Sequence, residues 1–131
     1  MSKIESASRA TVLVCITCRS AADPTDADEP RPGLILAEAT AAAANTTDIS
    51  VQRVRCLGNC SRGLSAAIRC DNAWTYVFGG LEASRDGLTL IAGARLLAGA
   101  ADGIMPWQGR PEPLKRGLIA RIPPANFSGS P

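Results

Sequence analysis

The chain has 131 residues, 14 Lys+Arg against 12 Asp+Glu, five cysteines and no histidine. The absence of histidine excludes Ser-His-Asp and Cys-His catalysis, and also histidine-ligated metal or haem sites. Any transition-metal site must therefore use thiolate, carboxylate or backbone ligands. The net charge of +2 is too small to favour nucleic-acid binding. The length suits one ordinary domain.

The N-terminal sequence MSKIESASRATVLVC lacks the long apolar segment of a secretory signal. No stretch of the chain approaches the roughly 18–20 apolar residues of a membrane span. We therefore expect a soluble, cytoplasmic protein that contacts no membrane. Because that compartment is reducing, the five cysteines do not predict a disulfide framework. They are expected to be metal ligands, redox groups or core residues.

The first half of the chain predicts a strand, a loop, a helix and a second strand. Residues 11–17 (TVLVCIT) form a short β-branched run that is typical of a strand. A polar, proline-rich loop over 19–33 leads into a helix over 34–44, for which Asn45 is the expected stop. Residues 49–55 alternate between apolar and polar, which predicts a second strand.

A hairpin is expected next. Residues 64–70 place alternate apolar side chains on one face of a third strand, and Asp71-Asn72 predicts a tight turn. A fourth strand follows, in which Trp74, Tyr76 and Phe78 share a face and which Gly79-Gly80 is expected to end. These aromatic side chains are expected to pack under a helix, with a dimer interface as the alternative.

The last predicted helix begins with Ser84 as its N-cap, runs to about Ala101 and is closed by Gly103. It is apolar almost all round, which indicates a buried helix. The proline-rich residues 105–131 are expected to form an extended tail packed on the domain of residues 1–104.

The element order β-α-β-β-β-α predicts an α+β fold of the thioredoxin-like type. The helical crossover between the first two strands implies that these strands are parallel, and the hairpin implies that strands three and four are antiparallel. The sheet is expected to be mixed and four-stranded, with two main helices. If both helices cover one side of it, the other side is an apolar surface, and a homodimer is then expected.

Four cysteines follow the ends of the first two strands. Cys15 and Cys18 form a CxxC motif at the end of the first strand, and Cys56 and Cys60 form CLGNC after the second. Because the carboxyl ends of adjacent parallel strands lie side by side, roughly 5 Å apart, the two pairs are expected to meet at one edge of the sheet. We call these four residues the strand-end cysteines.

An all-thiolate site suits a [2Fe–2S] cluster or a Cys₄ zinc site, and the spacing does not separate the two. Gly58, inside the second pair, allows backbone N–H groups to turn toward sulfur, and such hydrogen bonds tune a cluster's potential. The formal charge of an oxidised [2Fe–2S] site is about −2. The nearby arginines could offset this charge or could simply be solvated: Arg19, Arg53, Arg55 and Arg62.

Cys70 shares a face with Leu64, Ala66 and Ile68 and is expected to be a core residue. A redox dithiol at Cys15 and Cys18 is the alternative to a metal site. This motif lacks the preceding tryptophan and the internal proline of thioredoxins, and a long loop rather than a helix follows it.

The chain resembles a family of small bacterial predicted metal-binding proteins that are often associated with cobalamin or CobW-type metal-homeostasis genes. That family is related to the thioredoxin-like [2Fe–2S] ferredoxins. The resemblance covers nearly the whole chain and rests on these segments: VCITC with Arg19, RCLGNCSRG (55–63), WTYVFGGL (74–81), ADGIMPW (101–107), RPEPLKRG (110–117) and IARIPP (119–124). It implies a metal-binding thioredoxin-like domain whose ligands are Cys15, Cys18, Cys56 and Cys60.

The sequence thus favours a [2Fe–2S] protein that exchanges one electron with a redox partner protein and is not an enzyme. Arg55, Asn59 and Arg62 are expected to shape the surroundings of the site. The alternative is a carrier or sensor of zinc or another soft metal that works with a metallochaperone. A thiol–disulfide enzyme is the third hypothesis.

Overall fold

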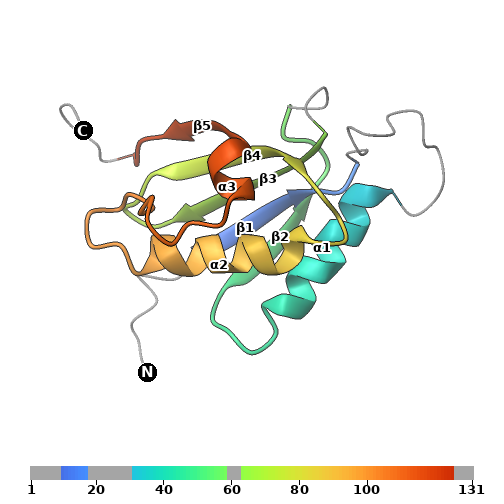
Figure 1. Cartoon of the computed structure of the whole chain (residues 1–131), viewed down its shortest axis with the longest axis horizontal. Helices are drawn as coiled ribbons and strands as arrows, with labels where there is room; N and C mark the ends of the chain where they lie inside the picture. Colours follow the sequence, from blue (N-terminus) through green and yellow to red (C-terminus); the bar gives the residue numbers. More distant parts are fainter. Residues whose placement is uncertain (1–9, 18–30, 59–62, 126–131) are drawn as a thin grey trace.

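The computed structural model describes residues 10–17, 31–58 and 63–125 (Figure 1). Five strands form one mixed sheet in the order β2-β1-β3-β4-β5. The elements, in chain order, are β1 (Ala10–Cys15), α1 (Pro32–Ala43), β2 (Ser50–Val54), β3 (Leu64–Cys70), β4 (Thr75–Leu81), α2 (Asp86–Ala98), α3 (Pro113–Arg116) and β5 (Leu118–Ile122). The expected α+β fold with a mixed sheet is confirmed.

The strand directions follow the predicted topology. β1 and β2 are parallel, whereas β3 is antiparallel to both β1 and β4. The turn at Asp71-Asn72 joins β3 to β4, and Asn72 adopts a φ of 64°, a conformation that asparagine tolerates better than most residues. The three inner strands, β1, β3 and β4, each pair on both sides, so their backbone groups are hydrogen-bonded within the sheet.

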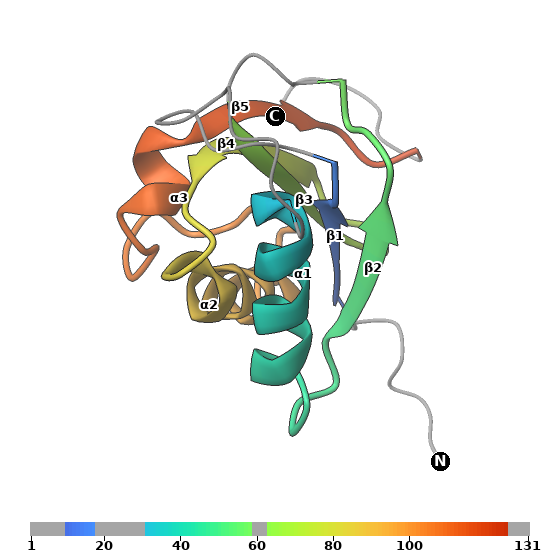
Figure 2. The same cartoon turned by 90° about the vertical axis from the view of Figure 1, so that its right-hand side faces the viewer.

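Helices α1 and α2 lie side by side on one face of the sheet (Figure 2). The core fills the space between this pair and the sheet. Tyr76 and Phe78 are almost fully buried there, with ring centroids 6.3 Å apart. Trp74 is half-buried and packs against the core. The three aromatic residues therefore pack on the helix side, as the first of the two sequence interpretations expects.

Three sequence expectations about element boundaries are wrong. Gly79-Gly80 does not end the fourth strand, because β4 continues to Leu81. α2 begins at Asp86 rather than after Ser84, and its N-cap residue, Arg85, makes no side-chain capping bond. Its C-cap is Gly99, so Gly103 is not the helix stop. The Asp86 carboxylate instead accepts the Glu82 N–H at 2.8 Å, which satisfies the turn before the helix.

The sequence predicts an extended tail over residues 105–131, but the structure contains a helix and a strand there. Within it, α3 begins at Pro113, a residue whose fixed φ suits a first helical turn. β5 then pairs with β4 and adds a fifth strand to the predicted four. Among the described residues, no helix has the length and apolar character needed to cross a membrane.

Candidate metal centre

β1 and β2 end next to each other. Cys15, the last residue of β1, lies opposite Val54, the last residue of β2. The Ile16 N–H continues the ladder by donating to the Val54 carbonyl at 2.9 Å. Cys56 follows Val54 by two positions. Cys15 and Cys56 therefore lie at the same end of the sheet, the edge formed by the carboxyl ends of β1 and β2. The expected parallel, adjacent pairing is confirmed, whereas Cys18 and Cys60 lie outside the described residues.

The Cys15 side chain is buried, with 1% of its surface exposed. Its thiol lies 3.5 Å from the Arg55 carbonyl oxygen and can donate to it. The Thr17 hydroxyl donates to the same carbonyl and lies 3.6 Å from the Cys15 sulfur. The peptide after β2 thus contacts the sulfur at the end of β1. If the thiol lost its proton to bind a metal, the Thr17 hydroxyl would still satisfy the Arg55 carbonyl.

Cys56 is exposed, and its sulfur accepts a hydrogen bond from the Gly58 N–H at 3.2 Å. Gly58 has a φ of 74°, which glycine adopts without the steric penalty of a Cβ. The turn that directs this N–H toward sulfur therefore depends on a glycine. An N–H donor of this kind stabilises negative charge on sulfur, as a metal-bound thiolate requires.

Positive side chains lie near this edge. Arg53 and Arg55 are exposed, and the half-buried Arg31 donates from its guanidinium to the Thr17 carbonyl at 3.1 Å. Arg31 directly precedes α1, so this bond ties the start of the helix to the end of the CxxC strand. The sequence interpretation missed Arg31 and Thr17. For Thr17, its place inside the CxxC motif was the available signal. Arg19, Asn59 and Arg62 lie outside the described residues.

Cys70 lies at the opposite end of the sheet. It pairs with Ala10, the first residue of β1, because β3 is antiparallel to β1. Its side chain is half-buried and packs against the core, as the sequence predicts. Burial raises the pKa of the Cys70 thiol, and the neighbouring Asp71 raises it further. Cys70 is therefore separated from Cys15 and Cys56 and is not poised to become a thiolate.

A family model described as "Protein of unknown function (DUF1636)" matches residues 12–124. The chain belongs to this family. The match includes all four strand-end cysteines. No curated protein and no solved structure matches the chain.

The described part of the site supplies two sulfur donors, one from the last residue of β1 and one from the second residue after β2. Within residues 10–17, 31–58 and 63–125, no group of three or more His, Cys, Asp or Glu side chains could hold a metal ion. Two of the four strand-end cysteines lie outside these ranges, so the four-cysteine ligand set stays a prediction. The donor chemistry of Cys15 and Cys56 fits a thiophilic metal or an iron–sulfur cluster.

Proposed function

We propose that this protein is a small electron-transfer protein that holds a [2Fe–2S] cluster with the thiolates of the strand-end cysteines. The observation that carries the proposal is the parallel pairing of β1 and β2, with Cys15 opposite Val54. This register brings one member of each cysteine pair to the same sheet edge. When bound, such a cluster takes up and releases one electron.

The chain's own groups would support the bound sulfur atoms. The Gly58 N–H donates to the Cys56 sulfur and favours the state with more negative charge on it. The Thr17 hydroxyl lies within reach of the Cys15 sulfur. The exposed guanidinium of Arg55 adds positive charge to the same edge, together with Arg53. We assign this site no covalent substrate chemistry.

The second candidate is a carrier or sensor of zinc or another soft metal in the same Cys₄ site. The exposure of Cys56 favours it, because an exposed ligand can pass a metal to a metallochaperone. A thiol–disulfide enzyme acting through Cys15 and Cys18 is less favoured, since the buried Cys15 thiol offers poor access for exchange. The relationships to thioredoxin-like ferredoxins and to CobW-type genes stay predictions, as do the cytoplasmic location and the homodimer.

Purification without oxygen tests the proposal. A red-brown protein with about two irons and two sulfides per chain is the expected result. A colourless protein with one zinc would support the carrier, and a colourless, metal-free protein with an exchangeable disulfide would support the enzyme. Either colourless outcome would overturn the [2Fe–2S] assignment.

Two matched serine substitutions test the location of the site. Cys56→Ser is expected to lose the metal, whereas Cys70→Ser at the other end of the sheet is expected to retain it. Metal content per chain after gel filtration is the measurement. If both variants bind metal equally well, the convergence of the two cysteine pairs does not form the site.

A further inference from the structure

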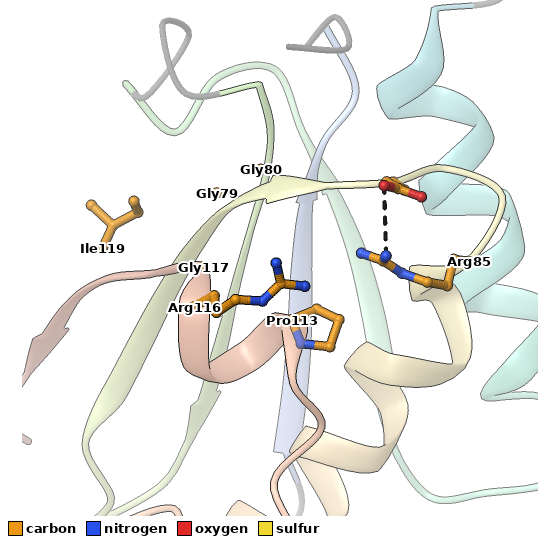
Figure 3. Close-up of a pocket in the computed structure, with 8 residues that line it drawn as sticks. Gly79, Gly80, Arg85, Pro113, Arg116, Gly117 and Ile119 are labelled. Atoms are coloured by element: carbon orange, nitrogen blue, oxygen red, sulfur yellow. Dashed lines mark ion pairs between the residues drawn. The ribbon is translucent and has the colours of Figure 1, made fainter. Parts of the chain in front are cut away.

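A pocket lies between β4, α3 and the start of α2 (Figure 3). It has a volume of about 340 Å³, toward the small end of the range for ligand sites. Its lining residues are Gly79, Gly80, Glu82, Arg85, Pro113, Arg116, Gly117 and Ile119. Leu81, next to this lining, pairs with Leu64 at the start of β3, so the pocket lies at the same end of the sheet as Cys15.

The pocket is open because glycines, which have no side chain, line it where the end of α3 packs against β4. The Gly79 N–H donates to the Gly117 carbonyl at 2.8 Å, which brings the end of α3 onto β4. A Cβ at Gly117 would lie 2.6 Å from the carbonyl oxygens of both Gly79 and Pro113. This close approach therefore requires glycine, and it leaves backbone rather than side chains along one wall.

Arg85 is held in place on one side of the pocket. Its Nε donates to one carboxylate oxygen of Asp86 and a terminal nitrogen donates to the other, each at 2.8 Å. Asp86 is fully buried. Burial pushes the pKa of Asp86 upward. The hydrogen bonds from Arg85 and from the Glu82 N–H outweigh this effect, so the net pKa is lowered and the carboxylate stays charged. A buried anion thus fixes the orientation of a guanidinium at the pocket.

Arg116 approaches from α3, and Figure 3 shows both guanidinium groups reaching into the space between α3 and the start of α2. Its one side-chain partner among the described residues is Glu112, with a 3.5 Å separation between mostly exposed groups. The remaining ion pair of Arg85, with Glu82, is also 3.5 Å long and exposed. Exposed ion pairs of this kind contribute little free energy, so an incoming anion can compete with the carboxylates for the two arginines.

We propose that this pocket binds a small oxyanion, the phosphate or carboxylate group of a small molecule, through Arg116 and the fixed Arg85. Planar guanidinium groups match both kinds of oxyanion with paired hydrogen bonds. The glycine-lined wall lets such a group approach the backbone closely. This site is separate from the strand-end cysteines and does not depend on the proposed metal.

Thermal unfolding in inorganic phosphate and in succinate, each against sodium chloride at equal ionic strength, tests the proposal. A ligand that binds only the folded state raises the unfolding midpoint in a saturable way, whereas salt exclusion raises it without saturation. We expect a saturable rise with at least one anion. Phosphate alone, succinate alone or both would identify the preferred oxyanion.

Matched variants locate the site. Arg116→Gln is expected to weaken anion binding at least tenfold, and Arg116→Lys less. Arg95→Gln, an exposed arginine in the last turn of α2, changes the net charge equally and is expected to leave binding unchanged. Non-saturable curves with both anions, or saturable binding equally strong in Arg116→Gln, would overturn the assignment.

Discussion

At one end of the sheet, cysteine sulfurs lie against backbone groups, and at the other a tyrosine and an arginine hold the segment that follows α2. The Tyr76 hydroxyl accepts the Met105 N–H at 2.9 Å, and Arg110 donates to the Met105 carbonyl at 2.6 Å and to the Pro106 carbonyl at 3.2 Å. These far-end groups are hydrogen-bonded to one another, so their role is to hold the structure together. At the cysteine end, by contrast, a thiol that lost its proton could donate a sulfur lone pair to a metal.

The largest expected effect is at the far end. Arg110 is 8% exposed, and its guanidinium lies over the rings of both Tyr76 and Trp107. Burial lowers the pKa of Arg110. Its hydrogen bonds to the two carbonyls stabilise the buried guanidinium. Arg110→Ala would leave those carbonyls without their donor and is expected to reduce the free energy of unfolding by about 3 kcal/mol.

Arg121→Ala is the control for Arg110→Ala. Arg121 also lies over an aromatic ring, that of Trp74 at 4.4 Å, but it is exposed. Its loss is expected to reduce the free energy of unfolding by only about 0.5 kcal/mol. Urea unfolding measures both variants. Equal losses would mean that the aromatic contact, rather than the bonds to the carbonyls, makes Arg110 important.

Tyr76→Phe should have a smaller effect at the same end. The ring stays in the core, but the buried Met105 N–H loses its acceptor, so we expect the free energy of unfolding to fall by about 1–2 kcal/mol. Hydrogen exchange at the Met105 amide should accelerate by more than the global loss of stability explains. An unchanged exchange rate would show that the hydroxyl does not hold this segment.

Asp86 adds a pH dependence at the cysteine end. Because its folded-state pKa is below the ordinary value of 3.8, its contribution is present above that pH and is lost as the pH falls through the folded-state pKa. Asp86→Asn is expected to cost about 1 kcal/mol at neutral pH, and the difference from the native chain should vanish in acid.

Exposed Asp48→Asn is the control for the Asp86 variant. Urea unfolding at a series of pH values is the measurement. A difference between the native chain and Asp86→Asn that persists unchanged at the lowest pH would contradict the proposed charge interaction with Arg85.

Periodicity in the sequence is sufficient to predict the first four strands, because their apolar residues recur at every second position. It does not predict the burial of β3, in which all five residues from Leu64 to Ile68 are buried. It does not reveal α3 and β5, which are short and lie in a proline-rich segment, where β5 is stabilised by pairing with β4. Similarly, α2 starts at Asp86, whose carboxylate accepts the Glu82 N–H from the turn before the helix. Local capping signals such as Ser84 do not contain that information.

The candidate metal centre, too, is only partly predictable from the sequence. Cysteine spacing and strand order predict that Cys15 and Cys56 share a sheet edge. The contacts around them depend on segments that are distant in the sequence, such as Arg55 beside Thr17. The arginine-lined pocket is a stronger example. Arg116 belongs to the RPEPLKRG segment (110–117), but nothing in the sequence pairs it with Arg85. Only the crossing of α3 over β4 brings them together.

The smallest effect on stability, and the sharpest test of the cysteine end, is expected for Thr17→Val. Thr17 is exposed, so the free energy of unfolding of the metal-free protein should change by less than about 0.5 kcal/mol. If Thr17 supports a metal-bound Cys15, however, metal transfer to a chelator should accelerate by about tenfold. Thr17→Ser keeps the hydroxyl and should behave like the native chain. Equal release rates from all three metal-loaded proteins would show that Thr17 has no role beside the sulfur. A protein that binds no metal at all would instead reject the metal centre itself.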